Sequence, residues 1–141
     1  MSDRDLHNLI ARYAELVDTG DFAGVGELFA EGTYSAGFGS ASGAADVTKA
    51  FQRIVILYPD GTPRTKHVTT NTILELDGDT AAARSYFTVF QAVADLLPLQ
   101  PIASGRYHDT FTRRDGQWRF TERRVTVDLA GDLRHHLHQI P

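Results

Sequence analysis

A histidine and an asparagine, His67 and Asn71, lie four residues apart in a segment with the composition of a β-strand. Residues 64–76 are rich in Thr, Val, Ile and Leu and lie between two turn-forming runs, which is typical of the first strand of a hairpin. Because side chains alternate along a strand, the two polar residues are predicted to share one face. They could line a wet pocket, with Asp18 near the end of an N-terminal helix as a carboxylate partner for His67. The alternative is a polar sheet edge that faces solvent.

The composition narrows the classes of function. The chain has 141 residues, of which 42% are hydrophobic and 23% charged, so we expect a single domain over residues 1–141 with one core. A net charge of −4 gives no basic surface for nucleic acid or an anionic membrane. The absence of cysteine excludes disulfides, zinc–thiolate sites, iron–sulfur clusters and cysteine nucleophiles. No apolar run is long enough for a membrane span and the start is polar, so we expect a cytoplasmic protein.

Three segments in the first part of the chain have the apolar spacing of helices. Residues 3–18 carry apolar side chains every three or four positions, and Gly20 ends this segment. A second, short helix begins at the capping residue Asp21, and residues 44–58 return to helical spacing. Between these two helices, residues 33–38 are predicted as a short strand, and a flexible loop rich in glycine and serine follows it.

The apolar period changes to two after residue 64. Strands are predicted over residues 65–76, 80–94, 103–113 and 117–128. Residues 129–141 are predicted to be a polar tail. Three helices followed by an antiparallel meander give an α+β fold, in which the helices cover one side of a curved antiparallel sheet. Such an arrangement leaves a conical cavity between helices and sheet.

In the last predicted strand, the positions expected to face inward change from even-numbered to odd-numbered residues. Trp118 and Phe120 share one parity, whereas Val125 has the other. A β-bulge shifts the alternation by one residue, so we predict a bulge between residues 121 and 124. The position of the bulge decides whether Arg123 or Arg124 faces inward, and the sequence leaves that choice open.

The order and spacing of several short motifs resemble the SnoaL-like branch of the NTF2-like superfamily. The resemblance runs almost from end to end and rests on Tyr13–Asp21, Leu28–Tyr34, His67 with Asn71, Asp79–Ala81 with Ser85–Tyr86, Gly105–Asp109 and Asp115–Phe120. It implies a cone made of a curved sheet wrapped against helices. Members include scytalone dehydratase, bile acid 7α-dehydratases, polyketide cyclases, Δ5-ketosteroid isomerase-like enzymes and the non-catalytic β subunits of ring-hydroxylating dioxygenases.

The resemblance implies a catalytic group made of Tyr13, Asp18 and His67. In the dehydratases a tyrosine and an aspartate five residues apart end the first helix, and a histidine comes from the strand after the third helix. A neutral imidazole is suited to remove an acidic proton near neutral pH, and a carboxylate on its other nitrogen stabilises the imidazolium that forms. Tyr13 could donate a hydrogen bond to the developing enolate or the leaving oxygen. This chemistry needs no cofactor and no metal.

Helix geometry leaves an alternative to this group. Tyr13 and Asp18 lie roughly 140° apart around an ideal helix, so both reach one cavity only if Asp18 lies at a fraying helix end. Otherwise Asp18 belongs to a polar helix end, and His67 is a wall histidine whose hydrogen bonds are satisfied locally.

Five further residues are predicted to bind the substrate: Tyr34, Phe51, Asn71, Tyr86 and Tyr107. An aromatic cavity suits a hydrophobic polycyclic, steroid-like or aromatic polyketide substrate, although each aromatic residue taken singly also fits ordinary core packing. Convex sheet faces of this kind usually pair, so we expect a homo-oligomer, a dimer or a trimer.

The histidines at 135, 136 and 138 could bind a metal, but no carboxylate or cysteine accompanies them at ligand spacing, so we assign them to the polar tail. No glycine-rich phosphate loop and no nucleophile elbow occurs. The sequence therefore favours a cofactor-independent lyase or isomerase, dehydratase-like in mechanism. The alternative is a non-catalytic domain that binds a small ligand or assembles like a dioxygenase β subunit.

Overall fold

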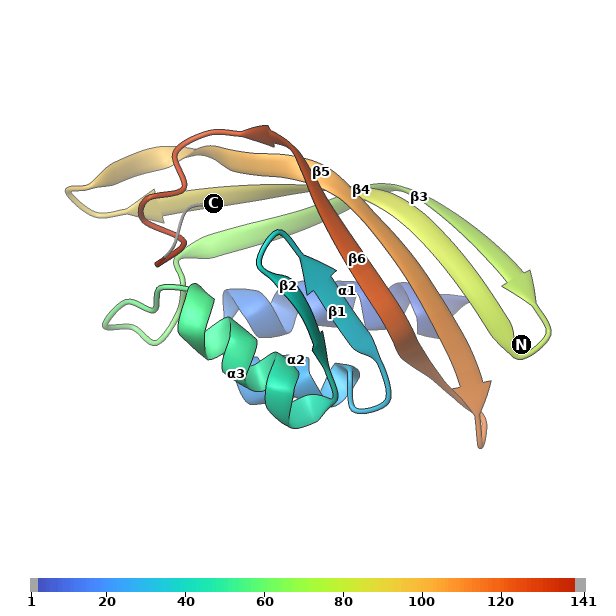
Figure 1. The fold of residues 1–141 in the computed structure, drawn as a ribbon. Helices are drawn as coiled ribbons and strands as arrows, with labels where there is room; N and C mark the ends of the chain where they lie inside the picture. The colour runs from blue at the N-terminus through green and yellow to red at the C-terminus, as the bar shows by residue number, and fades with distance from the viewer. Residues whose placement is uncertain (1–2, 139–141) are drawn as a thin grey trace.

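Three helices lie on the concave side of one curved sheet in the computed structural model, which describes residues 3–138 (Figure 1). The helices are α1 (Arg4–Asp18), α2 (Phe22–Leu28) and α3 (Ala44–Ile54). Each has one apolar face, as the spacing predicts, and this face packs toward the sheet. None of these helices has the length and apolar character needed to cross a membrane.

The sheet has six strands among the described residues, in the order β2-β1-β6-β5-β4-β3. The strands are β1 (Thr33–Ala36), β2 (Gly39–Ser42), β3 (Thr65–Asp77), β4 (Thr80–Val93), β5 (Leu97–Arg114) and β6 (Gln117–Ala130). The α+β class and the curved sheet packed against three N-terminal helices are confirmed. The sheet is mixed, however, because β1 pairs with β6 in parallel while all other neighbours are antiparallel.

The end of α1 is set by a Schellman motif. The backbone N–H of Asp21 donates to Leu16 O at 2.9 Å and that of Gly20 donates to Val17 O at 3.0 Å. Gly20 has φ +77°, which a residue with a side chain rarely adopts, and a Cβ there would lie 2.0 Å from the carbonyl oxygen of Gly61. The helix therefore ends directly after Asp18, and this carboxylate reaches β3.

The predicted bulge in β6 is present. Phe120 pairs with Phe111 and Glu122 pairs with Thr110, so Thr121 is the extra residue. Trp118 and Phe120 face the core before the bulge, and Arg123, which is fully buried, faces it afterwards. Arg124 lies on the exposed side, so the choice between the two arginines is settled in favour of Arg123.

One strand and two element ends differ from the prediction. Residues 39–42, expected as a loop, form β2, because Ser40 and Ser42 pair by hydroxyl hydrogen bonds with β1. Helix α3 ends at Ile54, four residues early. Strand β5 begins at Leu97 despite two prolines, because β6 pairs with β5 only from Ala103 onward and a proline is tolerated where one side of a strand is unpaired.

The C-terminal residues also differ from the predicted polar tail. Strand β6 continues to Ala130, and the segment after it turns back toward α3 (Figure 1). His138 N–H donates to Ile54 O at 2.8 Å, and Leu137 forms a β-bridge with Val55. We call residues 131–138 the C-terminal strap. Residues 139–141 of the predicted tail lie outside the described part of the chain.

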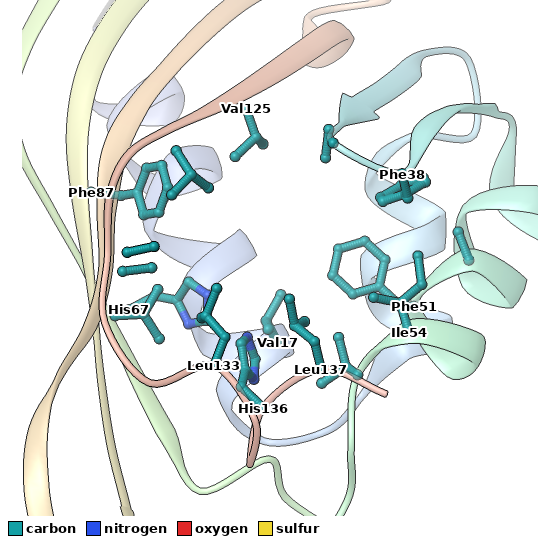
Figure 2. A pocket seen from close by; sticks show the side chains of 18 of the residues that line it. Val17, Phe38, Phe51, Ile54, His67, Phe87, Val125, Leu133, His136 and Leu137 are labelled. Carbon is teal, nitrogen blue, oxygen red and sulfur yellow. The ribbon is translucent and has the colours of Figure 1, made fainter. Parts of the chain in front are cut away.

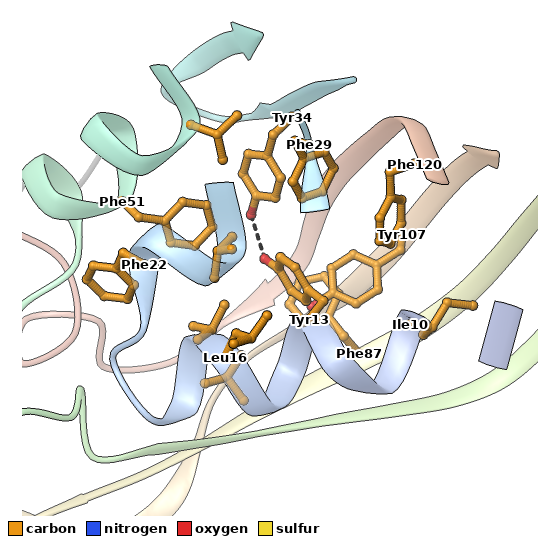
Figure 3. Packing of buried hydrophobic residues seen from close by; sticks show 14 of the residues in the cluster. Ile10, Tyr13, Leu16, Phe22, Phe29, Tyr34, Phe51, Phe87, Tyr107 and Phe120 are labelled. Atoms are coloured by element: carbon orange, nitrogen blue, oxygen red, sulfur yellow. Dashed lines mark hydrogen bonds between the residues drawn. The ribbon is translucent and has the colours of Figure 1, made fainter. Parts of the chain in front are cut away.

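Aromatic side chains fill the core between α1, the short hairpin and the sheet (Figure 3). Phe29 stacks on Phe120 with ring centroids 4.8 Å apart, and Phe87 stacks on Tyr107 at 4.5 Å. Such pairs stabilise the fold by about 1 kcal/mol each beyond the area they bury. The first pair joins the end of α2 to β6, and the second joins β4 to β5, where Phe87 and Tyr107 line the cavity described next.

Candidate active site

Asp18, the last residue of α1, and His67, near the start of β3, form a short hydrogen bond. Asp18 Oδ1 lies 2.6 Å from His67 Nδ1, and Oδ2 accepts the backbone N–H of the same residue at 2.8 Å. The hydroxyl of Thr65 also donates to Oδ1, at 2.9 Å. The side chains of His67 and Asp18 are only 7% and 10% exposed. Three donors therefore converge on one carboxylate, as a group that remains ionised requires.

The hydrogen bonds of Asp18 decide its charge state. Burial alone would raise the pKa of this carboxyl. The hydrogen bonds from His67, the positive charge that His67 can carry and the hydrogen bond from the Thr65 hydroxyl together outweigh burial and lower the pKa below its usual range. An ionised carboxylate accepts hydrogen bonds only, so Nδ1 of His67 must carry the proton of this pair. In the neutral ring, Nε2 then holds a free lone pair, which is the form a general base needs.

His67 lines a cavity of about 1030 Å³ between the sheet and the helices (Figure 2). Figure 2 shows Phe87 and Val125 on the sheet side and Phe38, Phe51 and Ile54 on the opposite side. Most of the lining residues are apolar. Small-molecule pockets have volumes of about 300 to 1,000 Å³, so the cavity is large enough for a small ligand. The His67 side chain in its wall is largely shielded from bulk water.

A second polar group at the cavity consists of two tyrosines. The hydroxyls of Tyr13 and Tyr34 lie 2.9 Å apart (Figure 3), and both residues line the cavity. The Tyr13 ring meets the His67 ring edge-on, with centroids 6.5 Å apart. Burial is the largest cause that raises the pKa of both phenols, so they remain protonated and can donate hydrogen bonds.

A fully buried ion pair packs against the rings of Tyr13 and Tyr107. Arg123 donates from Nε and Nη2 to the two carboxylate oxygens of Asp109, at 2.8 and 2.9 Å. Its guanidinium carbon lies 3.7 Å from the ring centroid of Tyr107 and 4.4 Å from that of Tyr13. Burial alone would lower the pKa of Arg123, but the Asp109 charge outweighs it and raises the pKa, so the arginine remains charged.

A family model for the SnoaL-like domain matches residues 2–124. The chain belongs to this family. A search of curated proteins gave no significant match. Among solved structures, a single-residue variant of Rv3472 of Mycobacterium tuberculosis, a protein of unknown function, is similar at 30% identity with a TM-score of 0.74, over 88% of this chain and 70% of that chain.

Two other solved structures show the same fold. An NTF2-like protein with a cystatin-like fold from Novosphingobium aromaticivorans is 26% identical with a TM-score of 0.75, over 89% of this chain and 80% of that chain. A candidate scytalone dehydratase from the same organism is 21% identical with a TM-score of 0.75, over 98% of this chain and 88% of that chain. The predicted NTF2-like cone of this SnoaL-like domain is therefore confirmed.

The structure brings six of the eight predicted site residues of this SnoaL-like domain together. Tyr13, Tyr34, Phe51, His67 and Tyr107 line the cavity, and Asp18 lies directly behind His67. The helix end places Asp18 within reach of the strand even though Tyr13 points to another side of α1, toward the core.

Asn71 and Tyr86 do not reach the cavity, contrary to the prediction. A bulge in β3 lies between Thr70 and Ile73, and Asn71 adopts φ +55° there, so the alternation that begins at His67 shifts before it reaches this residue. Asn71 is exposed. Tyr86 has the opposite parity to the inward-facing Phe87 and is 54% exposed on the outer face of the sheet.

His136 is a cavity residue that the sequence analysis assigns to the polar tail. His136, on the C-terminal strap, is buried and lines the cavity, with its ring centroid 6.3 Å from that of His67. Its signal in the sequence is the spacing of Leu133, His136 and Leu137, which fits one face of a helical turn. Within residues 3–138, no group of three or more His, Cys, Asp or Glu side chains is arranged to hold a metal.

Proposed function

We propose that this SnoaL-like domain is a cofactor-independent lyase or isomerase in which His67 is the general base. The observation that carries the proposal is the 2.6 Å contact between Asp18 Oδ1 and His67 Nδ1 at the wall of an apolar cavity. Nε2 is the nitrogen left to act on a bound molecule. General base catalysis of this type accelerates a reaction by about 10² to 10⁴-fold.

The reaction begins with an acidic C–H next to a carbonyl. Nε2 of His67 takes the proton, and the electron pair moves onto the carbonyl oxygen to form an enolate. Asp18 stabilises the imidazolium, and the Tyr13–Tyr34 hydroxyls donate a hydrogen bond to the oxyanion. The enolate then expels a β-hydroxyl, which takes the proton from His67 and leaves as water, or it regains the proton at another carbon. The first outcome is dehydration and the second is isomerisation.

The size and lining of the cavity support a hydrophobic substrate of polycyclic, steroid-like or aromatic polyketide type. A volume of about 1030 Å³ exceeds the need of a single ring, and aromatic side chains such as Phe51, Phe87 and Tyr107 offer faces for stacking. Similarity to a candidate scytalone dehydratase agrees with this class of substrate, at the level of fold.

Hydrogen exchange tests the proposal without knowledge of the full reaction. The protein is incubated in D₂O with a panel of polycyclic β-hydroxy ketones, and NMR follows both the loss of the C–H signal and the appearance of enone. We expect the wild type to catalyse exchange of the C–H next to the carbonyl. His67→Gln and His67→Ala should lower the rate at least 10²-fold while the circular dichroism spectrum stays unchanged.

A second histidine provides the control for this experiment. His108 lies on the outer side of β5, away from the cavity, so His108→Ala should leave exchange unchanged. If panel members bind to the wild type but none is exchanged or dehydrated, or if His67→Gln retains the rate, the domain is a non-catalytic ligand-binding or subunit-like module.

We also propose that the domain forms a homo-oligomer, a dimer or a trimer. The outer face of the sheet exposes large apolar side chains, namely Val68, Ile73, Tyr86 and Leu129. Pairing of this face would remove them from water. A solution mass equal to one chain, measured by light scattering, would contradict the proposal.

A further inference from the structure

His136 occupies an unusual place for a polar side chain. It is 8% exposed and lies beside His67 at the end of the cavity that the C-terminal strap closes (Figure 2). The two rings are 6.3 Å apart between centroids and inclined at 62°. Leu133 and Leu137 of the same strap line the cavity on either side of it in sequence. Asp132 and Arg134 of the strap also line the cavity, and they pair with each other at 2.8 Å. His136 is therefore the one imidazole that the strap presents to the cavity, between two leucines.

The main chain around His136 is fixed on both sides. Its carbonyl oxygen accepts the backbone N–H of Ile56 at 2.9 Å, and its own N–H donates to Leu133 O at 3.1 Å. The backbone N–H of His138 donates to Ile54 O at 2.8 Å. Two further donors, the Tyr58 hydroxyl and Gln91 Nε2, bind the carbonyl oxygen of His135. A ring on so firmly held a segment is preorganised, because its position costs no ordering when a ligand binds.

The imidazole of His136 has no hydrogen-bond partner within residues 3–138, and its Nδ1 is enclosed. An unsatisfied buried polar group opposes folding, so a leucine or phenylalanine at this position would stabilise the fold more than histidine does. Burial, followed by the effect of the nearby His67, lowers the pKa of His136 to about 3, so the ring is neutral at physiological pH. A neutral imidazole offers one donor and one acceptor. Such a group suits an uncharged hydroxyl.

We propose that His136 is a specificity-determining residue that, together with His67, binds one hydroxyl oxygen of the substrate. Two hydrogen bonds of about 2.8 Å that meet at one oxygen hold their two nitrogen atoms about 4.5 to 5.5 Å apart. Such a span fits between two rings whose centroids are 6.3 Å apart. The inference rests on the proposed function and deepens it. The hydroxyl held between the rings is the one that takes the proton from His67 and leaves as water, so the substrate class is a polycyclic β-hydroxy carbonyl compound.

A matched pair of probes, 2-naphthol and 2-methylnaphthalene, tests this inference by binding alone. The two molecules have nearly the same shape and differ in a hydroxyl and a methyl group. Isothermal titration calorimetry on the full chain should give a tighter complex with 2-naphthol for the wild type. His136→Phe should lower the affinity for 2-naphthol about three- to tenfold and leave that for 2-methylnaphthalene within about twofold. His136→Gln, which keeps a donor and an acceptor, should retain part of the preference.

His138→Ala is the control, because this substitution removes an exposed histidine from the same strap. The variant should bind both probes as the wild type does. Long-range ¹H–¹⁵N spectra of the imidazoles give a second readout: 2-naphthol, and not 2-methylnaphthalene, should shift the nitrogens of both His67 and His136. The inference is overturned if the wild type shows no preference for 2-naphthol, if His136→Phe retains the preference, or if that variant loses both probes equally.

These outcomes are separate from those that test the general base. A loss of hydroxyl preference in His136→Phe, with no exchange catalysed by the wild type, would support the binding role and reject the catalytic proposal. A wild type that catalyses exchange through His67, but shows no dependence of binding on His136, would support the general base and reject the role of the strap.

Discussion

Asp18 binds His67 twice, through the imidazole Nδ1 at 2.6 Å and through the backbone N–H at 2.8 Å. One carboxylate thus fixes both the orientation of the ring and the position of the strand that carries it. The Schellman motif at Gly20 places Asp18 in the last turn of α1, so the geometry of the dyad depends on where this helix ends. The same contact therefore contributes both to the proposed chemistry and to the docking of α1 on β3.

Asp18→Asn tests this double role. The pKa of Asp18 is lowered in the folded protein, so its stabilising effect is fully present above the ordinary value of 3.8 and is lost as the pH falls through the folded value. At pH 7 the variant should lose about 2 kcal/mol of unfolding free energy, since an ionised acceptor is replaced by a neutral one. The difference from the wild type should shrink below pH 4.

Urea denaturation over a pH series measures this effect, and Asp5→Asn is the control. Asp5 is an exposed residue in the first turn of the same helix, so its amide variant should follow the wild-type profile. Equal stability of Asp18→Asn and the wild type at pH 7 would contradict the assignment of an ionised carboxylate. Catalysed hydrogen exchange, where present, should fall about 10²-fold or more in the same variant.

The dyad was predictable from the sequence, whereas most of its surroundings depend on long-range packing. A histidine on a strand and an aspartate at a helix end, in the order of a known family, predict the pair. The parity change in β6 also predicts the bulge at Thr121, although only the register chosen in the sheet places Arg123 rather than Arg124 inside. Local patterns thus identify elements and faces, and tertiary pairing selects among the remaining choices.

The structure differs from the site prediction at Asn71, Tyr86 and His136, and the differences at Asn71 and His136 each have one physical source. Asn71 was assigned to the His67 face by strict alternation, but the bulge between Thr70 and Ile73 breaks that alternation, and no apolar parity change marks it. The sequence assigns His136 to a polar tail because the last thirteen residues have weak apolar periodicity and no carboxylate or cysteine accompanies the histidines at ligand spacing. Its burial follows from backbone hydrogen bonds to α3 and the segment after it, partners about eighty residues away that local periodicity cannot reveal.

The buried ion pair Arg123–Asp109 should contribute more to the unfolding free energy when intact than either charged residue does without its partner. Arg123→Met leaves the Asp109 carboxylate buried without its bidentate partner, so we expect a loss of about 3 to 5 kcal/mol of unfolding free energy. Asp109→Leu should cost a similar amount. The double variant should lose less than the sum of the two, because it removes both charges. A double-mutant cycle by urea denaturation measures the coupling.

An exposed bidentate pair, Arg106 with Asp128, provides the comparison for this cycle. Solvent screens this pair, so Arg106→Met should change stability much less than Arg123→Met. Strict additivity of the buried variants would show that Arg123 and Asp109 do not act as a unit. It would also weaken the view that they hold Tyr13 and Tyr107 in place.

Filling the cavity should weaken ligand binding at least tenfold without unfolding the domain. Val125 lines the cavity, whereas its neighbour Thr126 points to the outer face of β6. Val125→Trp should place an indole in space that a polycyclic ligand requires and lower the affinity for 2-naphthol at least tenfold, since bulk is accommodated in a void without overpacking the core. Thr126→Trp adds the same group on the other side and should bind as the wild type does. Unchanged binding by Val125→Trp would place the ligand elsewhere.

The buried His136 should make the domain sensitive to mild acid. Its pKa falls from an ordinary value of 6.5 to about 3 on folding, so the unfolded chain binds a proton that the folded chain does not. The contribution to stability is complete above pH 6.5 and is lost progressively as the pH falls from 6.5 toward 3, by at most about 1.4 kcal/mol per pH unit. The charge of Asp18, which favours protonation of His136, and that of His67, which opposes it, modulate this slope.

His136→Phe should remove this share of the acid sensitivity, so its unfolding free energy between pH 6.5 and 4 should vary less than that of the wild type. His138→Ala, which removes an exposed histidine of the same strap, should keep the wild-type slope. Thermal and urea denaturation at half-unit pH intervals resolve the difference. Parallel profiles for the wild type and His136→Phe would mean that the ring is already accessible to protons in the folded state. The strap would then open more readily than its four hydrogen-bonded contacts imply, which are those with Ile54, Ile56, Tyr58 and Gln91.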